Sequence, residues 1–324
     1  MSPKLDIIVK LIADSGSTKT HWALVTRSGQ RSDFFTEGLN PFHRSEEDIR
    51  RVLSDVLVPQ LGKFLWVGPI DEIAFYGAGC TPEKSLIIKD ILLDVFGNDG
   101  LSRANALNDG MMSSGLTVTV QSDMIGAAKA LLGRETGVAC ILGTGSASCL
   151  WDGEKITKQV PSLGYILGDE GSGAVLGRTL AGDALKGLMG ESLRLQFADW
   201  ILKNDELSRE QSSLNDELMI SRAQAHIIDK VYRQPMANRY LASLSKFCAE
   251  NRGEKETEAL LKKHFASFRD RVIDQYAAGK DGLIISFVGS IAWYYRDILE
   301  EVLAEKGYRV GRILQDPIDG LVDS

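Results

Sequence analysis

The chain has 324 residues, 44% of them hydrophobic and 25% charged, which is enough for about two globular domains with buried cores. Its formal net charge of −7 argues against nucleic acid or an anionic membrane as the main partner, because both attract clustered Lys and Arg. The four cysteines are scattered and form no C-x-x-C pair, which is typical of small buried side chains in a reducing, cytoplasmic protein.

Hydrophobic periodicity in the first third of the chain alternates between strand and helix patterns. It predicts, in chain order, strands over 5–13, 20–27 and 30–39, a helix over 45–60, a strand over 72–79 and a helix from Pro82 to about Phe96. Charged residues interrupt the segment MSPKLDIIVK, so we expect no secretory signal there.

The middle of the chain begins with a short strand that ends at Ser122. The string DMIGAAKALLG then predicts a helix, because its apolar residues recur at helical spacing and Gly133 supplies a stop. A strand–loop–strand pattern follows over 137–153, and the chain is mostly helical from 171 to 278.

The last segment contains a buried strand over 283–288, a bend at Gly289 and Ser290, and a helix over 291–307. The hairpin patterns at 7–26 and 137–153 have the same layout and suggest two related halves. The sequence therefore predicts an α/β fold with mixed sheets and two domains, residues 1–117 and 118–324.

Two polar loops have the composition of phosphate-binding loops. The first, DSGSTKT, runs from Asp14 to Thr20, and the second is Gly143-Thr144-Gly145-Ser146. Glycine lets the backbone approach a ligand, and hydroxyls with free N–H groups suit phosphate oxygens. Asp14 is a candidate for holding Mg²⁺ through water. The alternative is a pair of hairpin turns whose polar side chains satisfy their own amides.

Two carboxylates precede predicted helices. Asp123 lies at a strand-to-helix junction and is a candidate to accept a proton from a hydroxyl nucleophile, although the helix dipole is expected to lower its pKa. Asp169 lies among the glycines of GDEGSG, where a carboxylate can accept hydrogen bonds from a polyol. The alternative for each carboxylate is an ordinary role at a helix start, and for Asp123 taken in isolation the helix-start role is the favoured one.

Taken in order, the strings DSGSTKT, SDMIGAA, GTGS, GDEGSG and FVGS resemble the sugar-kinase, heat-shock and actin ATPase superfamily. More narrowly, they resemble the BadF/BadG/BcrA/BcrD ATPase family and its N-acetylglucosamine kinase branch. The resemblance covers essentially the whole chain. It implies two actin-like ATPase (ribonuclease H-like) domains, each with a mixed five-stranded sheet flanked by helices, with ATP in the interdomain cleft.

The resemblance also implies roles for individual residues. Asp123 would be the catalytic carboxylate, and Asp14 would lie near Mg²⁺. Residues near ATP would be Ser17, Thr18, Lys19, Thr20, Gly143, Thr144, Gly145, Gly289 and Ser290. Residues near the sugar would be Asn40, Asp123, Ser146 and Asp169, together with Ser162 and Leu163, which stand where the branch has Gly-Trp.

The departure at Pro161-Ser162-Leu163 leaves the identity of the sugar open, because the missing Trp belongs to the sugar pocket of the branch. The resemblance implies a homodimer that phosphorylates a small amino sugar, most simply N-acetylglucosamine, with ATP and Mg²⁺. Two other functions stay open: an activase that couples ATP hydrolysis to a partner, and a nucleotide-dependent sugar sensor. The scattered cysteines argue against the activase, which needs iron–sulfur ligands.

Overall fold

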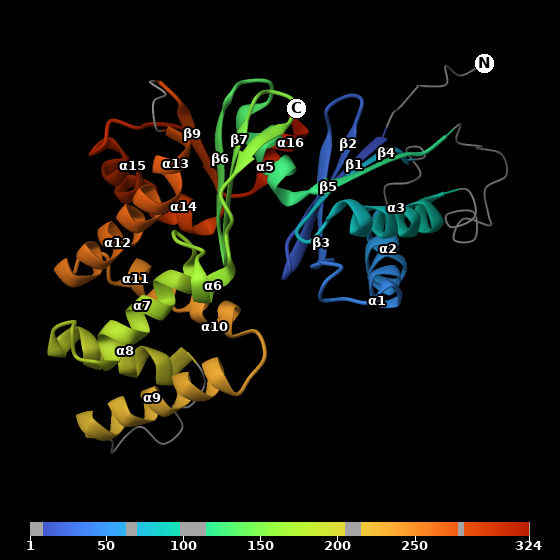
Figure 1. The fold of residues 1–324 in the computed structure, drawn as a ribbon. Coiled ribbons are helices and arrows are strands. Elements are labelled where there is room, and N and C mark those ends of the chain that lie inside the picture. Colours follow the sequence, from blue (N-terminus) through green and yellow to red (C-terminus); the bar gives the residue numbers. More distant parts are fainter. Residues whose placement is uncertain (1–8, 63–69, 98–114, 205–214, 278–281, 324) are drawn as a thin grey trace. The chain divides into compact units, whose positions relative to one another are not determined.

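The structure, a computed structural model, describes residues 9–62, 70–97, 115–204, 215–277 and 282–323. The chain forms two compact units. The first contains Met1–Arg134 together with Asp316–Ser324, and the second contains Glu135–Gln315. Each unit is built on a five-stranded sheet with helices packed against it (Figure 1).

The sheet of the first unit has the strand order β3-β2-β1-β4-β5. Strands β1, β2 and β3 are antiparallel, whereas β1, β4 and β5 run parallel, so the sheet is mixed as predicted. The strands span Val9–Ser15 (β1), Lys19–Thr26 (β2), Arg31–Glu37 (β3), Ile70–Gly77 (β4) and Thr117–Ser122 (β5).

Both faces of this sheet are covered, because alternate residues of a strand point to opposite sides. Leu11 and Ala13 belong to the core beneath the helices that follow β3 and β4, whereas Ile12, buried between them in sequence, lies outside that core. These helices are α1 (Glu46–Arg51), which continues through a π-helical turn (Val52–Leu57) into α2 (Val58–Leu61), and α3 (Pro82–Phe96).

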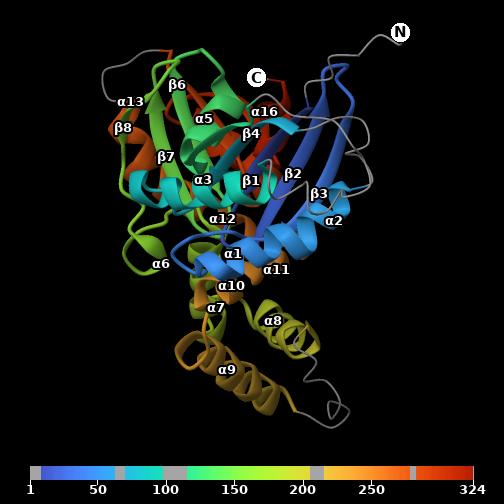
Figure 2. The same ribbon diagram turned by 90° about the vertical axis from the view of Figure 1, so that its right-hand side faces the viewer.

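The other face is covered by α5 (Asp123–Leu132) and α16 (Pro317–Val322), and Figure 2 shows the sheet between these two sets of helices. Helix α16 packs on α5, β1 and β2. A Cβ at Gly320 would lie 2.2 Å from the carbonyl oxygen of Ala130, so glycine permits this close contact. Sequence analysis did not predict α16, because six residues give too short a periodic pattern.

The sheet of the second unit has the order β10-β9-β6-β7-β8. Strands β6, β7 and β8 are antiparallel, whereas β6, β9 and β10 are parallel, which again gives the predicted mixed arrangement. The strands span Gly137–Leu142 (β6), Ser146–Trp151 (β7), Ile156–Gln159 (β8), Ile284–Val288 (β9) and Arg309–Leu314 (β10).

Helices fill most of the second unit between β8 and β9, as predicted for this region. They are α6 (Gly164–Leu167), α7 (Gly173–Leu185), α8 (Glu191–Asn204), α9 (Asp216–Tyr232), α10 (Ala237–Ser243), α11 (Ser245–Glu250), α12 (Lys255–Phe268) and α13 (Asp274–Ala277). Between α12 and α13 lies a π-helical segment, Arg269–Ile273. After β9, the predicted single helix is divided at Tyr295 into α14 (Ser290–Tyr294) and α15 (Arg296–Ala304).

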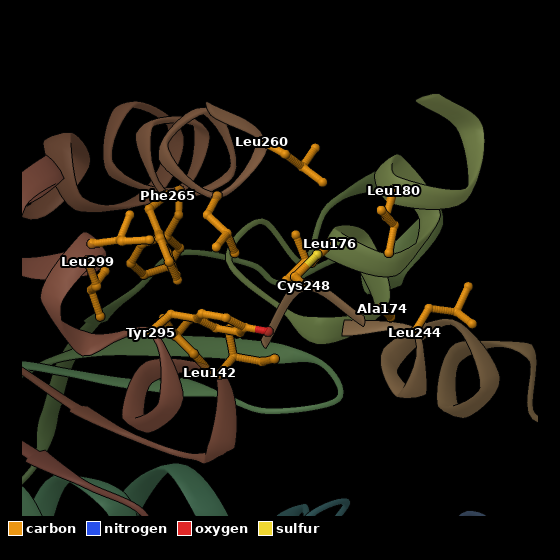
Figure 3. Close-up of a cluster of buried hydrophobic side chains, with 14 of the residues drawn as sticks. Leu142, Ala174, Leu176, Leu180, Leu244, Cys248, Leu260, Phe265, Tyr295 and Leu299 are labelled. Carbon is orange, nitrogen blue, oxygen red and sulfur yellow. The ribbon is translucent and has the colours of Figure 1, made fainter. Parts of the chain in front are cut away.

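One continuous core joins these helices to the second sheet. Figure 3 shows Leu176 and Leu180 of α7, Leu260 and Phe265 of α12, and Leu142 at the end of β6 in this core. Burial of such side chains contributes roughly 1.5–3 kcal/mol each. The core therefore holds the loop after β6 and the start of α7 on rigid elements.

The predicted strands and helices agree closely with the observed ones, whereas β8 and β10 were not predicted. Residues 5–8 of the first predicted strand lie outside the described residues. The predicted domain boundary at 117/118 does not coincide with the boundary between the compact units. The reason is that β5 pairs with β4 and α5 packs on β4, so both belong to the first unit.

Within the described ranges, no helix combines the length and apolar composition required to cross a bilayer.

Candidate active site

The candidate residues of the first unit lie at one edge of its sheet. Strands β1, β4 and β5 are parallel, and their last residues, Ser15, Gly77 and Ser122, are aligned by the strand register. The segments that follow these strands therefore meet at the same edge. This arrangement brings together segments that follow Ser15, Gly77 and Ser122 and are therefore 45 to 107 residues apart in the sequence.

The first predicted phosphate loop is the turn of the β1–β2 hairpin. The N–H of Gly16 donates to the carbonyl of Lys19 over 3.0 Å, which leaves Ser17 and Thr18 at the turn. A Cβ at Gly38 would lie 2.3 Å from the Gly16 carbonyl oxygen, so the chain after β3 lies directly against this loop. In this loop Gly16 and Ser17 are half-buried and Thr18 is exposed, so its tip has small residues of the kind that a phosphate site requires.

The proximity of Thr20 to ATP stays a prediction, but its side chain is already engaged within the hairpin. Its hydroxyl is buried, pairs with the Ser15 hydroxyl at 2.8 Å and donates to the carbonyl of Glu37 at 3.1 Å. This side chain therefore stabilises the hairpin and is not available to a phosphate. Thr18 and Lys19 remain exposed, although Lys19 also forms an ion pair with Asp316 at 3.6 Å.

Asn40 contacts the first loop directly. Its amide nitrogen donates to the Ser17 hydroxyl over 2.9 Å, and its amide oxygen accepts from the N–H of Phe42 over 2.9 Å. A Cβ at Gly79, after β4, would lie 2.4 Å from this amide oxygen, and Gly79 has a φ of +79°. Asn40 therefore orders the loop, and its second amide hydrogen remains for a ligand.

Asp123 is the first residue of α5, and Ser122 is the N-cap of that helix. The N–H of Met124 donates to the Asp123 carboxylate over 2.9 Å. The predicted lowering of its pKa is wrong. Burial raises the pKa of Asp123 above its ordinary value and outweighs the backbone hydrogen bonds that lower it. A carboxylate with a raised pKa accepts a proton more readily.

Asp14, which sequence analysis predicted to lie near Mg²⁺, is the last residue but one of β1. Burial, followed by the charges of Asp316 and Asp123, raises the pKa of Asp14 to about 7. No group of three metal-ligating side chains occurs in the described part of the chain. Mg²⁺ commonly binds through one or two carboxylates and keeps water and substrate phosphates as its other ligands, so a magnesium role for Asp14 stays a prediction.

Asp316 is a further candidate site residue, which the sequence motifs did not reveal. It lies at the N-cap of α16, and the Nδ1 atom of His21 is 2.9 Å from its carboxylate. The other ring nitrogen of His21 is 2.8 Å from Asp33. Burial lowers the pKa of His21, but the hydrogen bonds to both carboxylates outweigh burial and raise it. His21 thus fixes Asp316 beside the hairpin, and the Asp-Pro pair before α16 was its only sequence signal.

The second unit has a corresponding sheet edge. Strands β6 and β9 are parallel, and Gly143–Gly145 and Gly289-Ser290 follow their carboxyl ends. Gly289 has a φ of +115°, and a Cβ there would lie 2.5 Å from the carbonyl oxygen of Leu142. Gly289 therefore allows the start of α14 to lie flat against the Gly143 loop.

The side chain of Asp169 lies against this second loop. Asp169 has a φ of +55°, and a Cβ at Gly145 would lie 3.1 Å from its carboxylate oxygen. Burial raises the pKa of Asp169 to about 6, against the effect of hydrogen bonds from the N–H groups of Gly164 and Ser146. The same segment is fixed to Ser162, whose carbonyl accepts from the Asp169 N–H over 2.8 Å. Leu163 beside it is exposed.

The structure thus assembles two groups of predicted residues. In the first unit these are Asp14, Ser17, Thr18, Lys19, Asn40 and Asp123, and in the second unit Gly143, Thr144, Gly145, Ser146, Ser162, Leu163, Asp169, Gly289 and Ser290. Sequence analysis predicts that the two groups bind the same ATP molecule. This involves both units and stays a prediction.

Solved structures provide the comparison that identifies the family. A protein from Porphyromonas gingivalis (PG1100), named as a proposed N-acetylglucosamine kinase, is 37% identical over 97% of each chain with a TM-score of 0.80. A Chromobacterium violaceum protein with the same proposed name is 17% identical over 98% of each chain with a TM-score of 0.56, which shows the fold. No protein-family model and no curated protein matches the sequence.

The match to the P. gingivalis protein covers 97% of this chain and therefore extends over both units, and it agrees with the resemblance that the loop motifs predicted. The chain therefore belongs to the family of sugar kinases with the actin-like ATPase fold that includes this P. gingivalis protein.

Proposed function

We propose that this protein transfers the γ-phosphoryl group of ATP to a hydroxyl of an amino sugar, most simply N-acetylglucosamine. The observation that carries the proposal is the position of Asp123. Its carboxylate lies at the sheet edge that also holds Asp14 and the Asn40 loop, and burial raises its pKa. The name of the P. gingivalis relative supports the choice of sugar.

Asp123 orients the sugar hydroxyl and receives its proton while the hydroxyl oxygen forms a bond to the γ-phosphorus. The bond from that phosphorus to the bridging oxygen breaks, and ADP leaves. Mg²⁺, held near Asp14, would neutralise charge on the phosphates. Asn40 contributes its second amide hydrogen to the sugar, and the glycine-lined loops supply backbone N–H groups to the phosphates.

The proposal is tested by coupled ADP release over a panel of sugars that includes N-acetylglucosamine, glucosamine, N-acetylmannosamine and glucose. We expect ADP release to depend on the sugar and to be fastest with N-acetylglucosamine. ATP turnover that no sugar changes would instead favour the sensor or the activase. The four cysteines do not favour an activase, since all are buried and burial raises their thiol pKa values.

Asp169 predicts a pH dependence of sugar binding. Because its pKa is raised to about 6, the carboxylate ionises only as the pH passes 6, and the ionised form accepts hydrogen bonds from sugar hydroxyls most strongly. We expect the sugar Kd, measured by calorimetry, to fall as the pH rises from 5 to 7. In Asp169→Asn this part of the pH dependence should vanish and the Kd should rise about tenfold.

The pH dependence of protein stability provides an independent test of the raised pKa of Asp169. The folded-state pKa of Asp169 lies above the value of 3.8 for an unperturbed aspartate, so ionisation costs stability as the pH rises from about 4 through 6. Asp169→Asn should therefore gain Tm relative to the parent protein at pH 8 but not at pH 4. Asparagine also tolerates the left-handed backbone at this position. An identical Tm difference at both pH values would contradict the raised pKa.

A further inference from the structure

A cavity lies within the second unit, beside the segment that carries Asp169. Its volume is about 290 Å³, close to the lower end of the range for small-molecule sites. Its walls are formed by α6, the turn that contains Gly168 and Glu170, one face of α7, one face of α12, and Arg271 of the π-helical segment after α12. The packing of Leu260 on α12 and Leu176 on α7 into one core fixes these walls (Figure 3).

The cavity carries an excess of positive charge. Arg178, Lys263 and Arg271 line it, and Glu170 is the acidic residue in its lining. Glu170 lies 3.6 Å from Arg271, and Arg178 donates to backbone carbonyls of α6. Lys263 forms no ion pair within the part of the chain that the structure describes. An anion in the cavity therefore has an uncommitted ammonium group available to it.

His264 lines the same cavity and is 94% buried, with a relative exposure of 6%. Its Nε2 atom has no hydrogen-bond partner among the described residues. Burial lowers the pKa of His264 to about 4, so the ring is neutral at physiological pH. A backbone hydrogen bond to Gly171 occupies the other nitrogen, which leaves Nε2 as an acceptor. A buried acceptor without a donor is costly, and a hydroxyl would satisfy it.

We propose that this cavity binds a small hydroxylated anion of the sugar-phosphate class. The phosphate pairs with Lys263 and Arg271, and a hydroxyl donates to Nε2 of His264. The cavity is separate from the proposed sugar site, because Asp169 faces Gly145 and Ser146 whereas the next residue, Glu170, faces the cavity.

This inference goes beyond the proposed function and does not depend on phosphoryl transfer. Under the proposed function, the product of the reaction belongs to the same chemical class. A sugar phosphate bound here would contact Arg271 and so compete with Glu170, the neighbour of Asp169. Binding of a sugar phosphate in the cavity would therefore change the contacts of Glu170 and, through it, the segment that contains Asp169.

Calorimetry on the full chain without ATP tests the site. The probes are glucose 6-phosphate, inorganic phosphate and glucose, with N-acetylglucosamine at saturation to occupy the proposed sugar site. We expect glucose 6-phosphate to bind with one site per chain and at least tenfold more tightly than either other probe. Full competition by N-acetylglucosamine would place the probe in the substrate site and overturn the proposal.

Two charge reversals on α12 provide the matched comparison. Lys263 lines the cavity, whereas Lys255 is exposed at the start of the helix and outside it. Lys263→Glu should weaken glucose 6-phosphate binding at least tenfold, while Lys255→Glu should bind like the parent protein. Equal binding in both variants, or phosphate bound as tightly as glucose 6-phosphate, would refute the site. Because calorimetry needs no turnover, an inactive kinase would leave this test intact.

Discussion

Replacing Asp123 by Asn is expected to lower kcat for sugar phosphorylation by about 10²–10⁴-fold. The amide still accepts a hydrogen bond from the substrate hydroxyl but cannot take up its proton, so the sugar KM should change little. The Met124 N–H can donate to the amide oxygen as it does to the carboxylate, which preserves the start of α5. Initial rates of coupled ADP release over a range of sugar concentrations separate kcat from KM.

The control is Asp90→Asn, which makes the same chemical change at an exposed position on α3. This variant should retain the parent kcat, and both variants should show the parent circular dichroism spectrum. Full sugar-dependent ADP release by Asp123→Asn would show that the mechanism proposed for this carboxylate is incorrect.

Replacing Gly289 by Ala is expected to impair ATP binding. The new Cβ would lie 2.5 Å from the Leu142 carbonyl oxygen and 3.3 Å from the Gly143 nitrogen, and the φ of +115° is unfavourable for alanine. Strain of this kind costs about 1–3 kcal/mol. Because the methyl group pushes apart the two loops predicted to contact ATP, we expect the ATP KM to rise at least tenfold.

Gly182→Ala is the matched control, since no atom lies within 4 Å of a Cβ at this position in α7. It should leave the ATP KM unchanged and raise stability by up to about 1 kcal/mol through helix propensity. Thermal unfolding and ATP titrations of both variants test the pair. If Gly289→Ala is destabilised but keeps the ATP KM of the parent protein, this loop does not belong to the nucleotide site.

The sequence alone determined most of the strands and helices, because their signals are local. The short apolar run Leu11-Ile12-Ala13, and the helical spacing of apolar residues after Asp123, identify β1 and α5 without knowledge of their neighbours. The sequence also predicted the candidate binding loops, because glycine, hydroxyl and carboxylate residues are concentrated at the ends of strands. The weakest predictions were short elements such as β8 and α16, whose few residues carry little periodicity.

Only the tertiary structure decided which polar groups are exposed, paired or electrostatically coupled. Thr20 appears in the same motif as Thr18, yet hydrogen bonds to Ser15 and Glu37 consume its hydroxyl. The pKa of Asp123 rises because the effect of burial is larger than that of the backbone hydrogen bonds at the helix N-terminus, which lower it. Burial depends on how the whole chain packs. Asp316 reaches Asp14 from some 300 residues away, because α16 returns to the first unit. The sequence specifies local pattern and composition, whereas desolvation and long-range charge pairing arise only when distant segments pack together.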